Sequence, residues 1–348
     1  MKILGIETSC DETAAAVVED GQWMLSNVIS SSVDLYAAYG GVVPEIAARS
    51  HVEVIIPVVK QALDDAGSGW DDIDAIAVTN RPGLIGSLLI GVMAARTLAV
   101  IKKKPLFGIN HVLAHTYANF ITGTSLPSYS LNVKAPQFPA LGLIVSGGHT
   151  QLMLYKSHTD YKVLGQTKDD AVGEAFDKAA KILGLSYPGG PSVDKAAQDG
   201  DPNSVKLPKP KLESSYDFSF SGLKTATLRA AQAMAGKDFT FPSKELPKVL
   251  TDRQKADLAA SFQKTAIDIL AEAVATAEQQ FKPKNVLLAG GVAANQGLRQ
   301  VLQARLQTPL LYPDIKLCTD NAAMITSAAY YWQQKADNPY KLAVIPSL

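Results

Sequence analysis

Apolar runs alternate with helical patterns along the chain. Two segments each predict a strand, a tight loop and a second strand. In the first segment these are residues 2–7, 8–12 and 13–18, and in the second they are residues 141–145, 146–148 and 149–155. A Gly-Gly pair between two apolar runs is typical of a β-hairpin. Mixed helix and strand patterns follow each hairpin, so we expect two α/β lobes. Because hairpins are common, this pattern leaves a duplication open.

The remaining periodicity predicts three strands and five helices. The strands are at residues 74–79, 106–109 and 285–289, and the helices are at residues 84–101, 173–183, 256–280, 294–306 and 321–334. Residues 121–139 are rich in Ser, Pro and Thr, which is typical of a connection. We therefore expect lobes at residues 1–120 and 121–325, the second with an inserted loop at about 201–221. The second lobe ends at residue 325, and we expect a C-terminal helix at about 326–348 to pack back on the first lobe.

Composition narrows the class of protein. The 348 residues are 47% apolar, and 33 Lys and Arg balance 33 Asp and Glu. Neutrality at this hydrophobic content excludes a disordered polyelectrolyte and gives no global argument for nucleic-acid binding, although local basic patches remain possible. Cys10 and Cys318 form no disulfide framework. The longest apolar run, 84–95, has the length of a buried helix, and no targeting segment is evident, so we expect a cytoplasmic protein without a membrane partner.

Two histidines stand at the spacing of metal ligands. If a helix begins at Asn110, a good N-cap residue, His111 and His115 lie on one face and can bind one divalent cation. Val112 stands where a zinc protease carries its catalytic Glu, which argues against that class. Asp320 is a candidate third ligand, although Asp just before a helix is also an ordinary cap.

Glycine-containing loops offer candidate sites for a nucleotide. Residues 8–13, 146–150 and 290–295 each place amides or hydroxyls at a bend, where anions are readily bound. Glu174 and Asp177 share a helix face near Gly189 and Gly190, whose backbone could approach a ribose or base. Glycine turns and solvated carboxylates occur in every fold, so each signal is weak alone. Neither a Walker A nor a Rossmann fingerprint is present.

Taken together, these segments resemble one family. They occur in order as Ile6 to Thr13 (IETSCDET), the histidine pair, Ser146 to Leu152 (SGGHTQL), Gly173 to Lys178 (GEAFDK), Tyr187 to Pro191 (YPGGP), Phe218 to Thr225 (FSFSGLKT) and Gly290 to Asn295 (GGVAAN). They are similar to those of TsaD, the bacterial tRNA N6-adenosine threonylcarbamoyltransferases. The match runs nearly from end to end. Leu113-Ala114 before the second histidine departs from the family's usual residues, but both histidines are kept.

The resemblance implies an α/β, two-lobed fold of the actin-like and sugar-kinase-like ATPase kind with a duplicated core. It implies transfer of threonylcarbamoyl from threonylcarbamoyl-adenylate to N6 of the adenosine after the anticodon, in tRNAs reading codons that begin with A. By the same resemblance His111, His115 and Asp320 bind one Fe2+ per subunit, with another divalent metal possible in vitro. The substrate-contacting positions it implies are Ile144, Val145, Ser146, Gly147, Gly148, Asp177, Gly190 and Asn295, with Asp194 and His149 as weaker candidates.

Further roles are hypotheses. Asp11 or Glu12 is a candidate for assisting loss of the N6 proton, because both carboxylates lie in a loop expected to face the cleft. Lysines at residues 102–104, 206–211 and 282–284 are candidate phosphate contacts. The resemblance implies two partners besides tRNA, a TsaB-like paralogue and a TsaE-like ATPase. A helix at residues 45–59 could dock the paralogue, although an amphipathic helix facing the core explains it equally well.

Three other functions remain open at this point. A metal-dependent small-molecule carbamoyltransferase or a kinase would share the fold, and sugar phosphorylation would identify the kinase. A metalloprotease would share the histidine pair. A non-catalytic scaffold would tolerate loss of His111 and Asp320.

Overall fold

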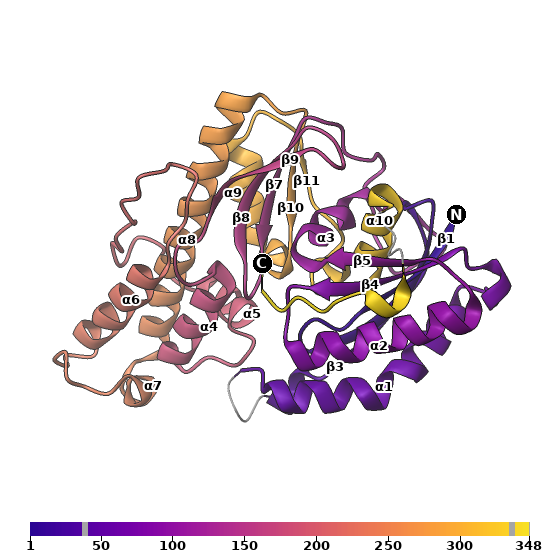
Figure 1. Ribbon diagram of the computed structural model, residues 1–348. Coiled ribbons are helices and arrows are strands. Elements are labelled where there is room, and N and C mark those ends of the chain that lie inside the picture. The colour runs from indigo at the N-terminus through magenta and orange to yellow at the C-terminus, as the bar shows by residue number, and fades with distance from the viewer. Residues whose placement is uncertain (37–40, 334–337, 348) are drawn as a thin grey trace. The chain divides into compact units, whose positions relative to one another are not determined.

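The computed structural model describes residues 1–36, 41–333 and 338–347. Its backbone contacts divide the chain into two compact units, Met1–Pro136 with Leu311–Leu348 and Gln137–Leu310. Each unit is built on one β-sheet with helices packed on it (Figure 1). The chain thus leaves the first unit, forms the second, and returns to the first.

The sheet of the first unit has the strand order β5-β4-β1-β2-β3-β6. Its strands are β1 (Lys2–Glu7), β2 (Glu12–Glu19), β3 (Trp23–Ser31), β4 (Ala75–Arg81), β5 (Leu106–Asn110) and β6 (Gly123–Thr124). The predicted first hairpin is confirmed, since β1 and β2 pair antiparallel from Lys2 opposite Glu19 to Glu7 opposite Ala14. β4 runs parallel on the other side of β1.

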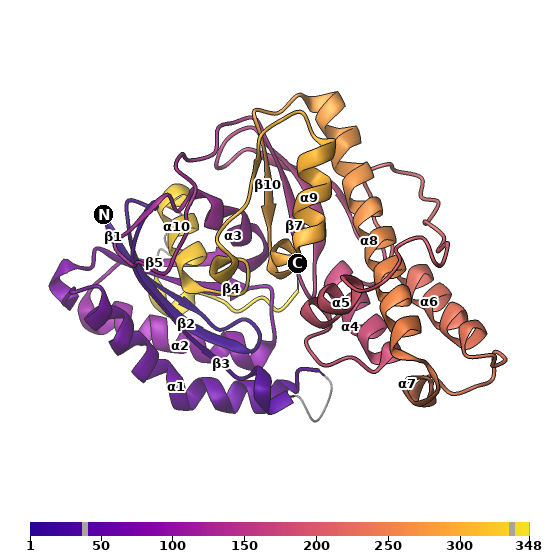
Figure 2. The same cartoon turned by 180° about the vertical axis from the view of Figure 1, so that it is seen from behind.

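Successive residues of β1 face two different layers of helices, one on each side of the sheet. Leu4 and Ile6 join a buried cluster with Ile55 of α1 (Pro44–Asp65) and Val92 of α2 (Ile85–Lys102). Gly5, between them, faces α10 (Ala322–Trp332), where a Cβ would lie 2.8 Å from the Ala322 carbonyl oxygen. Successive strand residues point to opposite faces, so α10 covers the face opposite α1 and α2 (Figures 1 and 2). The short helix α3 (His111–Tyr117) packs beside α10.

The second unit repeats this topology. Its sheet order is β11-β10-β7-β8-β9, with strands β7 (Ala140–Val145), β8 (Thr150–Tyr155), β9 (Tyr161–Gln166), β10 (Asn285–Ala289) and β11 (Leu310–Leu311). β7, β8 and β9 form an antiparallel meander, and β10 runs parallel on the other side of β7. A meander with a parallel strand beside its first member occurs in both sheets. This shared order supports the predicted duplication of an α/β core.

Six helices complete the second unit. They are α4 (Val172–Leu183), α5 (Gly189–Ala197), α6 (Ser221–Met234), α7 (Leu246–Val249), α8 (Asp252–Phe281) and α9 (Gln296–Arg305). Short 3-10 turns occur at Val33–Tyr36, Trp70–Asp72, Ala118–Phe120, Ser243–Glu245, Gly291–Ala294, Ile315–Leu317 and Pro339–Lys341. α8 begins before the predicted residue 256, because Thr251 and Gln254 form a capping box.

Two stretches differ from the sequence-based prediction. α10 ends at Trp332, because the next residue, Gln333, adopts a left-handed backbone conformation (φ 48°). The described residues 338–347 contain only a 3-10 turn. The prediction of a C-terminal helix that extends to residue 348 is therefore wrong. Residue 334 lies outside the described residues. α5 begins at Gly189, in a stretch for which the sequence analysis predicts no helix. Proline is well tolerated in the first turn of a helix, where its missing N–H costs no hydrogen bond.

α2 is long and apolar enough to cross a membrane by length and composition alone. Here one side of it, including Leu88, Val92 and Ala95, is buried against the sheet and α1. Its other side carries Ile85 and Leu89, which are 67% and 47% exposed.

We expect Gly5→Ala to destabilise the first unit by about 1–3 kcal/mol, because overpacking forces neighbours apart. The new Cβ would lie 2.1 Å from the Thr326 hydroxyl oxygen. Urea unfolding measures the effect. Gly222→Ala is the control, since no heavy atom lies within 4 Å of its Cβ position in α6. Equal stability of the two variants would contradict the close approach of β1 and α10.

Candidate metal centre and substrate loops

The histidine pair is positioned by a helix start. The Asn110 Oδ1 accepts a hydrogen bond from the Leu113 amide at 3.2 Å, which caps α3 as predicted. His111 and His115 therefore fall on one face, with ring centroids 4.7 Å apart. Both side chains are buried.

Asp320 reaches the histidines from the other end of the chain. The interpretation of Asp320 as the helix cap is wrong, because Asn321 caps α10 by accepting a hydrogen bond from the Met324 amide. The Asn321 Nδ2 also donates to the Leu317 and Thr319 carbonyls, which fixes the turn that carries Asp320. The carboxylate of Asp320 is thus available to the site.

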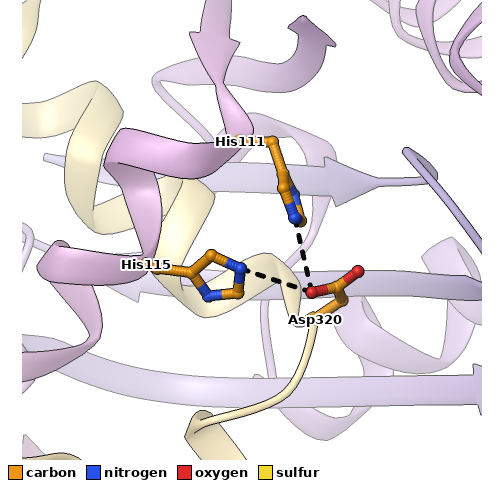
Figure 3. Close-up of side chains that lie close together, drawn as sticks. All are labelled: His111, His115 and Asp320. Atoms are coloured by element: carbon orange, nitrogen blue, oxygen red, sulfur yellow. Dashed lines mark ion pairs between the residues drawn. The ribbon is translucent and has the colours of Figure 1, made fainter. Parts of the chain in front are cut away.

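The three side chains converge on one point (Figure 3). The Nε2 atoms of His111 and His115 each lie 3.4 Å from the same oxygen, Oδ1 of Asp320. A metal bonded to such atoms at about 2.0–2.2 Å separates neighbouring ligand atoms by about 3.0–3.5 Å. One atom from each residue lies within 4.8 Å of the others. The arrangement therefore fits a metal ion with two nitrogen ligands and one oxygen ligand.

Glu7 lies behind His111 and is fully buried. Its Oε2 is 3.1 Å from the Nδ1 of His111. Burial opposes ionisation of Glu7, but the charge of His111 and its hydrogen bond lower the pKa of this carboxyl below its ordinary value. Burial disfavours the charged imidazole in turn, but the carboxylates of Asp320 and Glu7 raise the pKa of His111 well above its ordinary value. The site thus concentrates negative charge around the histidines.

The negative charge of this site acts on the loop between β1 and β2 and on Glu12, the first residue of β2. Burial, and then the charges of Asp320 and Asp11, raise the pKa of Glu12 to about 10. Burial and the nearby carboxylates also raise the pKa of the Cys10 thiol, so this cysteine is a poor nucleophile. Crowding of like charges is relieved by a bound cation, which agrees with the geometry of the His/His/Asp cluster.

Two helices hold this loop from behind. The Cys10 carbonyl accepts hydrogen bonds from the Nε2 of His51 in α1, at 3.0 Å, and from the hydroxyl of Ser87 in α2, at 3.2 Å. The Thr8 hydroxyl donates to the Ser87 carbonyl. The candidate acid–base residues Asp11 and Glu12 therefore lie on a loop anchored to α1 and α2.

The predicted substrate residues of the second unit lie at the ends of its elements. Ile144 and Val145 are buried at the end of β7, and Gly147 and Gly148 are exposed in the turn that follows. The turn is closed by a hydrogen bond from the Ser146 amide to the His149 carbonyl and by one from the His149 amide to the Ser146 hydroxyl. α4 approaches this turn closely, since a Cβ on Gly173 would lie 2.5 Å from the Ser146 carbonyl oxygen.

Asp177 and the glycine pair also meet. The Asp177 Oδ1 accepts a hydrogen bond from the Gly189 amide at 2.6 Å, at the start of α5. Burial raises the pKa of Asp177. Gly190 follows and has open space around its Cβ position. Glu174, by contrast, is exposed and pairs with Lys178, so it belongs to a solvated face.

The Asn295 side chain both caps a helix and contacts two other polar side chains. Its Oδ1 caps α9 by accepting from the Leu298 amide, while its Nδ2 donates to Asp194 Oδ1 at 3.2 Å and to Gln263 Oε1 at 2.9 Å. The weak candidate Asp194 is thus tied to a stronger one. The preceding Gly290 has φ 92°, with the Val145 carbonyl 2.4 Å from its Cβ position, so a side chain is excluded there.

Sequence reasoning missed Glu7 and His51. The apolar pattern explains Glu7 only as the end of a strand, yet a carboxylate that ends an otherwise apolar strand is a signal, because such a group needs partners when buried. His51 lies in a helix whose apolar pattern indicates packing and gives no sign of a role for the histidine.

The predicted lysine clusters lie where cations are favourable or paired. Those at residues 102–104 and 282–284 lie at the C-terminal ends of α2 and α8, and Lys209 pairs with Glu272.

Comparison with known proteins identifies close relatives. The family model described as "TsaD: tRNA N6-adenosine threonylcarbamoyltransferase" matches residues 24–327. A protein of that name from Thermomicrobium roseum is 54% identical, covering 96% of this chain and 93% of its own length. One from Symbiobacterium thermophilum is 49% identical, covering 99% and 96%.

A solved structure shares the fold at low sequence identity. Full-length HypF, in its phosphate- and nucleotide-bound form, aligns with a TM-score of 0.57 and 11% identity over 96% of this chain and 46% of its own. The chain therefore shares its α/β fold, built on two sheets, with this part of HypF, which confirms the predicted α/β fold class.

The raised pKa of Glu12 predicts a pH-dependent cost in the metal-free protein. Folded Glu12 keeps its proton up to about pH 10, whereas unfolded Glu12 loses it near its ordinary value. The folded state therefore binds more protons, and its stability falls as pH rises between these values. We expect Glu12→Gln to stabilise the chelator-treated protein by up to about 3 kcal/mol at pH 7, and much less at pH 5.

Urea unfolding at both pH values in the presence of a chelator measures this difference. Glu53→Gln, at an exposed position of α1, is the control and should follow the wild type at each pH. A Glu12→Gln effect of the same size at pH 5 and pH 7 would exclude the raised pKa.

Proposed function

Because the chain belongs to the TsaD family of tRNA N6-adenosine threonylcarbamoyltransferases, we propose that it modifies the adenosine 3′ to the anticodon in tRNAs reading codons that begin with A. The donor is threonylcarbamoyl-AMP. A bond forms between N6 and the carbamoyl carbon, the bond from that carbon to the phosphate oxygen breaks, AMP leaves and N6 loses one proton. The family match over most of the chain is the observation that carries this proposal.

We assign the metal centre to one Fe2+ per subunit. Two imidazole nitrogens and one carboxylate oxygen on a single side leave other positions open, as in non-haem iron(II) sites. Another divalent ion can occupy such ligands in vitro. When bound by His111, His115 and Asp320, the ion supplies a Lewis acid that polarises a substrate oxygen.

The chain's own residues supply binding and proton transfer. The Gly147-Gly148 and Gly290-Gly291 turns present backbone suited to the adenylate and its phosphate. Gly190, Asp177 and Asn295, with Asp194 and His149 as weaker candidates, contact the nucleotide. Orientation matters because the adenine amine is a poor nucleophile.

Asp11 and Glu12 divide the acid–base work in this proposal. Burial, the first cause of its raised pKa, favours the protonated form of Glu12, so Glu12 donates a hydrogen bond. Asp11 accepts the proton from N6.

A TsaB-like paralogue docks on the outer faces of α1 and α2 in this account. Five exposed apolar residues at helical spacing form what we term the α1/α2 patch: Val52, Ile56, Ile85, Leu89 and Met93. The two helices pack side by side (Figure 1). Exposed apolar patches on a folded protein mark interaction sites. A TsaE-like ATPase is the second protein partner.

Activity is tested with an unmodified tRNA that reads an A-starting codon. We expect threonylcarbamoyladenosine when this tRNA is incubated with the protein, its partners and threonylcarbamoyl-AMP, as measured by nucleoside mass spectrometry. His111→Ala should lower the rate at least about 100-fold, because a ligand of the metal is lost. His158→Ala, in a loop of the second unit, is the matched control and should retain the wild-type rate.

The outcomes separate the parts of the proposal. Product formed equally by His111→Ala would keep the transferase and exclude the metal mechanism. Full activity of an Asp11→Asn/Glu12→Gln double variant would exclude these carboxyls from proton transfer. No product in any reaction would favour the alternative, a small-molecule carbamoyltransferase or kinase of the same fold.

The docking surface is tested by introducing charge. Ile56→Asp and Leu89→Asp should each weaken association with the paralogue by at least about 10-fold in isothermal titration calorimetry, because burying an unpaired carboxylate is costly. Val133→Asp is the control, since Val133 is 92% exposed and lies outside the patch. Unchanged affinity in both patch variants would place the interface elsewhere.

A further inference from the structure

Both carboxylate oxygens of Glu7 accept hydrogen bonds from groups that the fold holds in place. The Ser9 amide donates to its Oε1 at 2.5 Å, and the Thr79 hydroxyl of β4 donates to its Oε2 at 2.5 Å. The side chain has no exposed surface. A buried carboxylate with such donors is fixed in place and acts as an acceptor.

The third group at Glu7 is the imidazole of His111. Its Nδ1 lies 3.1 Å from Glu7 Oε2 and 3.1 Å from the Ser9 hydroxyl oxygen. An unprotonated Nδ1 would direct a lone pair at a carboxylate oxygen, which is repulsive. A protonated Nδ1 donates to that oxygen, and the hydroxyl can serve as a second acceptor.

The tautomer decides what the other nitrogen can do. With the proton on Nδ1, the Nε2 of a neutral imidazole has a free lone pair, and this is the atom that faces Asp320 at 3.4 Å. Only an unprotonated ring nitrogen can bind a metal. A carboxylate behind the ring also makes that nitrogen a stronger ligand.

We propose that Glu7 is a positioning residue that holds His111 in the Nδ1–H tautomer, so that its Nε2 is the metal ligand. The inference rests on the metal centre of the proposed function. It adds a role for a residue that lies outside the His/His/Asp cluster and reaches the metal only through His111.

Glu7→Gln tests this role with little change in shape. The Ser9 amide can only donate, so it keeps the amide oxygen of the variant at the Oε1 position. The amide NH2 then faces His111 and donates to Nδ1, which moves the ring proton to Nε2. We expect the affinity for Zn2+, used as a diamagnetic probe, to fall about 10–100-fold in competition titrations with a chromophoric chelator.

Two control variants separate tautomer from stability. Glu278→Gln alters a buried carboxylate of the second unit, which accepts hydrogen bonds from the Gln307 and Thr308 amides, and should leave Zn2+ affinity unchanged. Ser9→Ala removes the other neighbour of Nδ1 and should change affinity less than about 3-fold, because the carboxylate remains.

The tautomer itself is read from long-range 1H–15N spectra of protein labelled at histidine nitrogen. The chain has five histidines, so assignment by substitution is practical. We expect wild-type His111 with Zn2+ to be protonated at Nδ1 and bound through Nε2. This spectrum decides the matter even if Glu7→Gln fails to fold, since coordination through Nδ1 would overturn the inference.

The remaining outcomes distinguish the two proposals. Zn2+ binding by wild type and Glu7→Gln with equal affinity would overturn the role of Glu7 and leave the metal centre intact. Absence of Zn2+ binding to the wild type would overturn both.

Discussion

The packing of α10 against α3 brings a carboxylate from one end of the chain to two histidines from the other. Tyr331 and Trp332 of α10 contact the Tyr117 ring, and the Trp332 indole N–H donates to the Tyr117 hydroxyl at 2.7 Å. Two asparagine caps then set the details, with Asn110 starting α3 and Asn321 starting α10. The candidate metal centre exists only when the returning segment of the first unit is docked.

The contacts that position the residues of the candidate metal centre also hold the first unit together. Gly5 permits α10 to approach the sheet, so the residue that gives β1 its close contact also sets the position of Asp320. Glu7 ends the same strand and supports His111 from behind. Burial and the negative charge gathered here raise the pKa of Glu12, and this crowding costs folding energy that a bound cation would relieve. A metal bound at His111, His115 and Asp320 would therefore couple its binding to completion of the first unit.

The sequence predicts local features of the site well and long-range ones less well. Asn110 and the spacing of His111 and His115 are local, because a cap and an i, i+4 pair need only a helix. Asp320 could be joined to them only by the family resemblance, since its partners lie about 200 residues away in the chain. Local rules favoured Asp320 as a cap, and the neighbouring Asn321 takes that role.

The hairpins were predictable for the same reason, and α5 was not. Alternating apolar runs around Gly147 and Gly148 specify a turn, whereas Gly189 and Gly190 are the first two residues of a helix that packs on α8. Tertiary packing outweighs the low helix propensity of glycine there. Glu7 illustrates the remaining limit, because its role depends on Thr79 and His111, which neighbouring strands and α3 bring to it.

The central claim is that one metal ion is held by His111, His115 and Asp320. Anomalous diffraction at the iron edge, from crystals of the protein loaded anaerobically with Fe2+, tests it most directly. The account predicts one peak per subunit, about 2.0–2.2 Å from Nε2 of both histidines and from a carboxylate oxygen of Asp320. A peak bound to other residues, or no peak in crystals grown at saturating Fe2+, would contradict it.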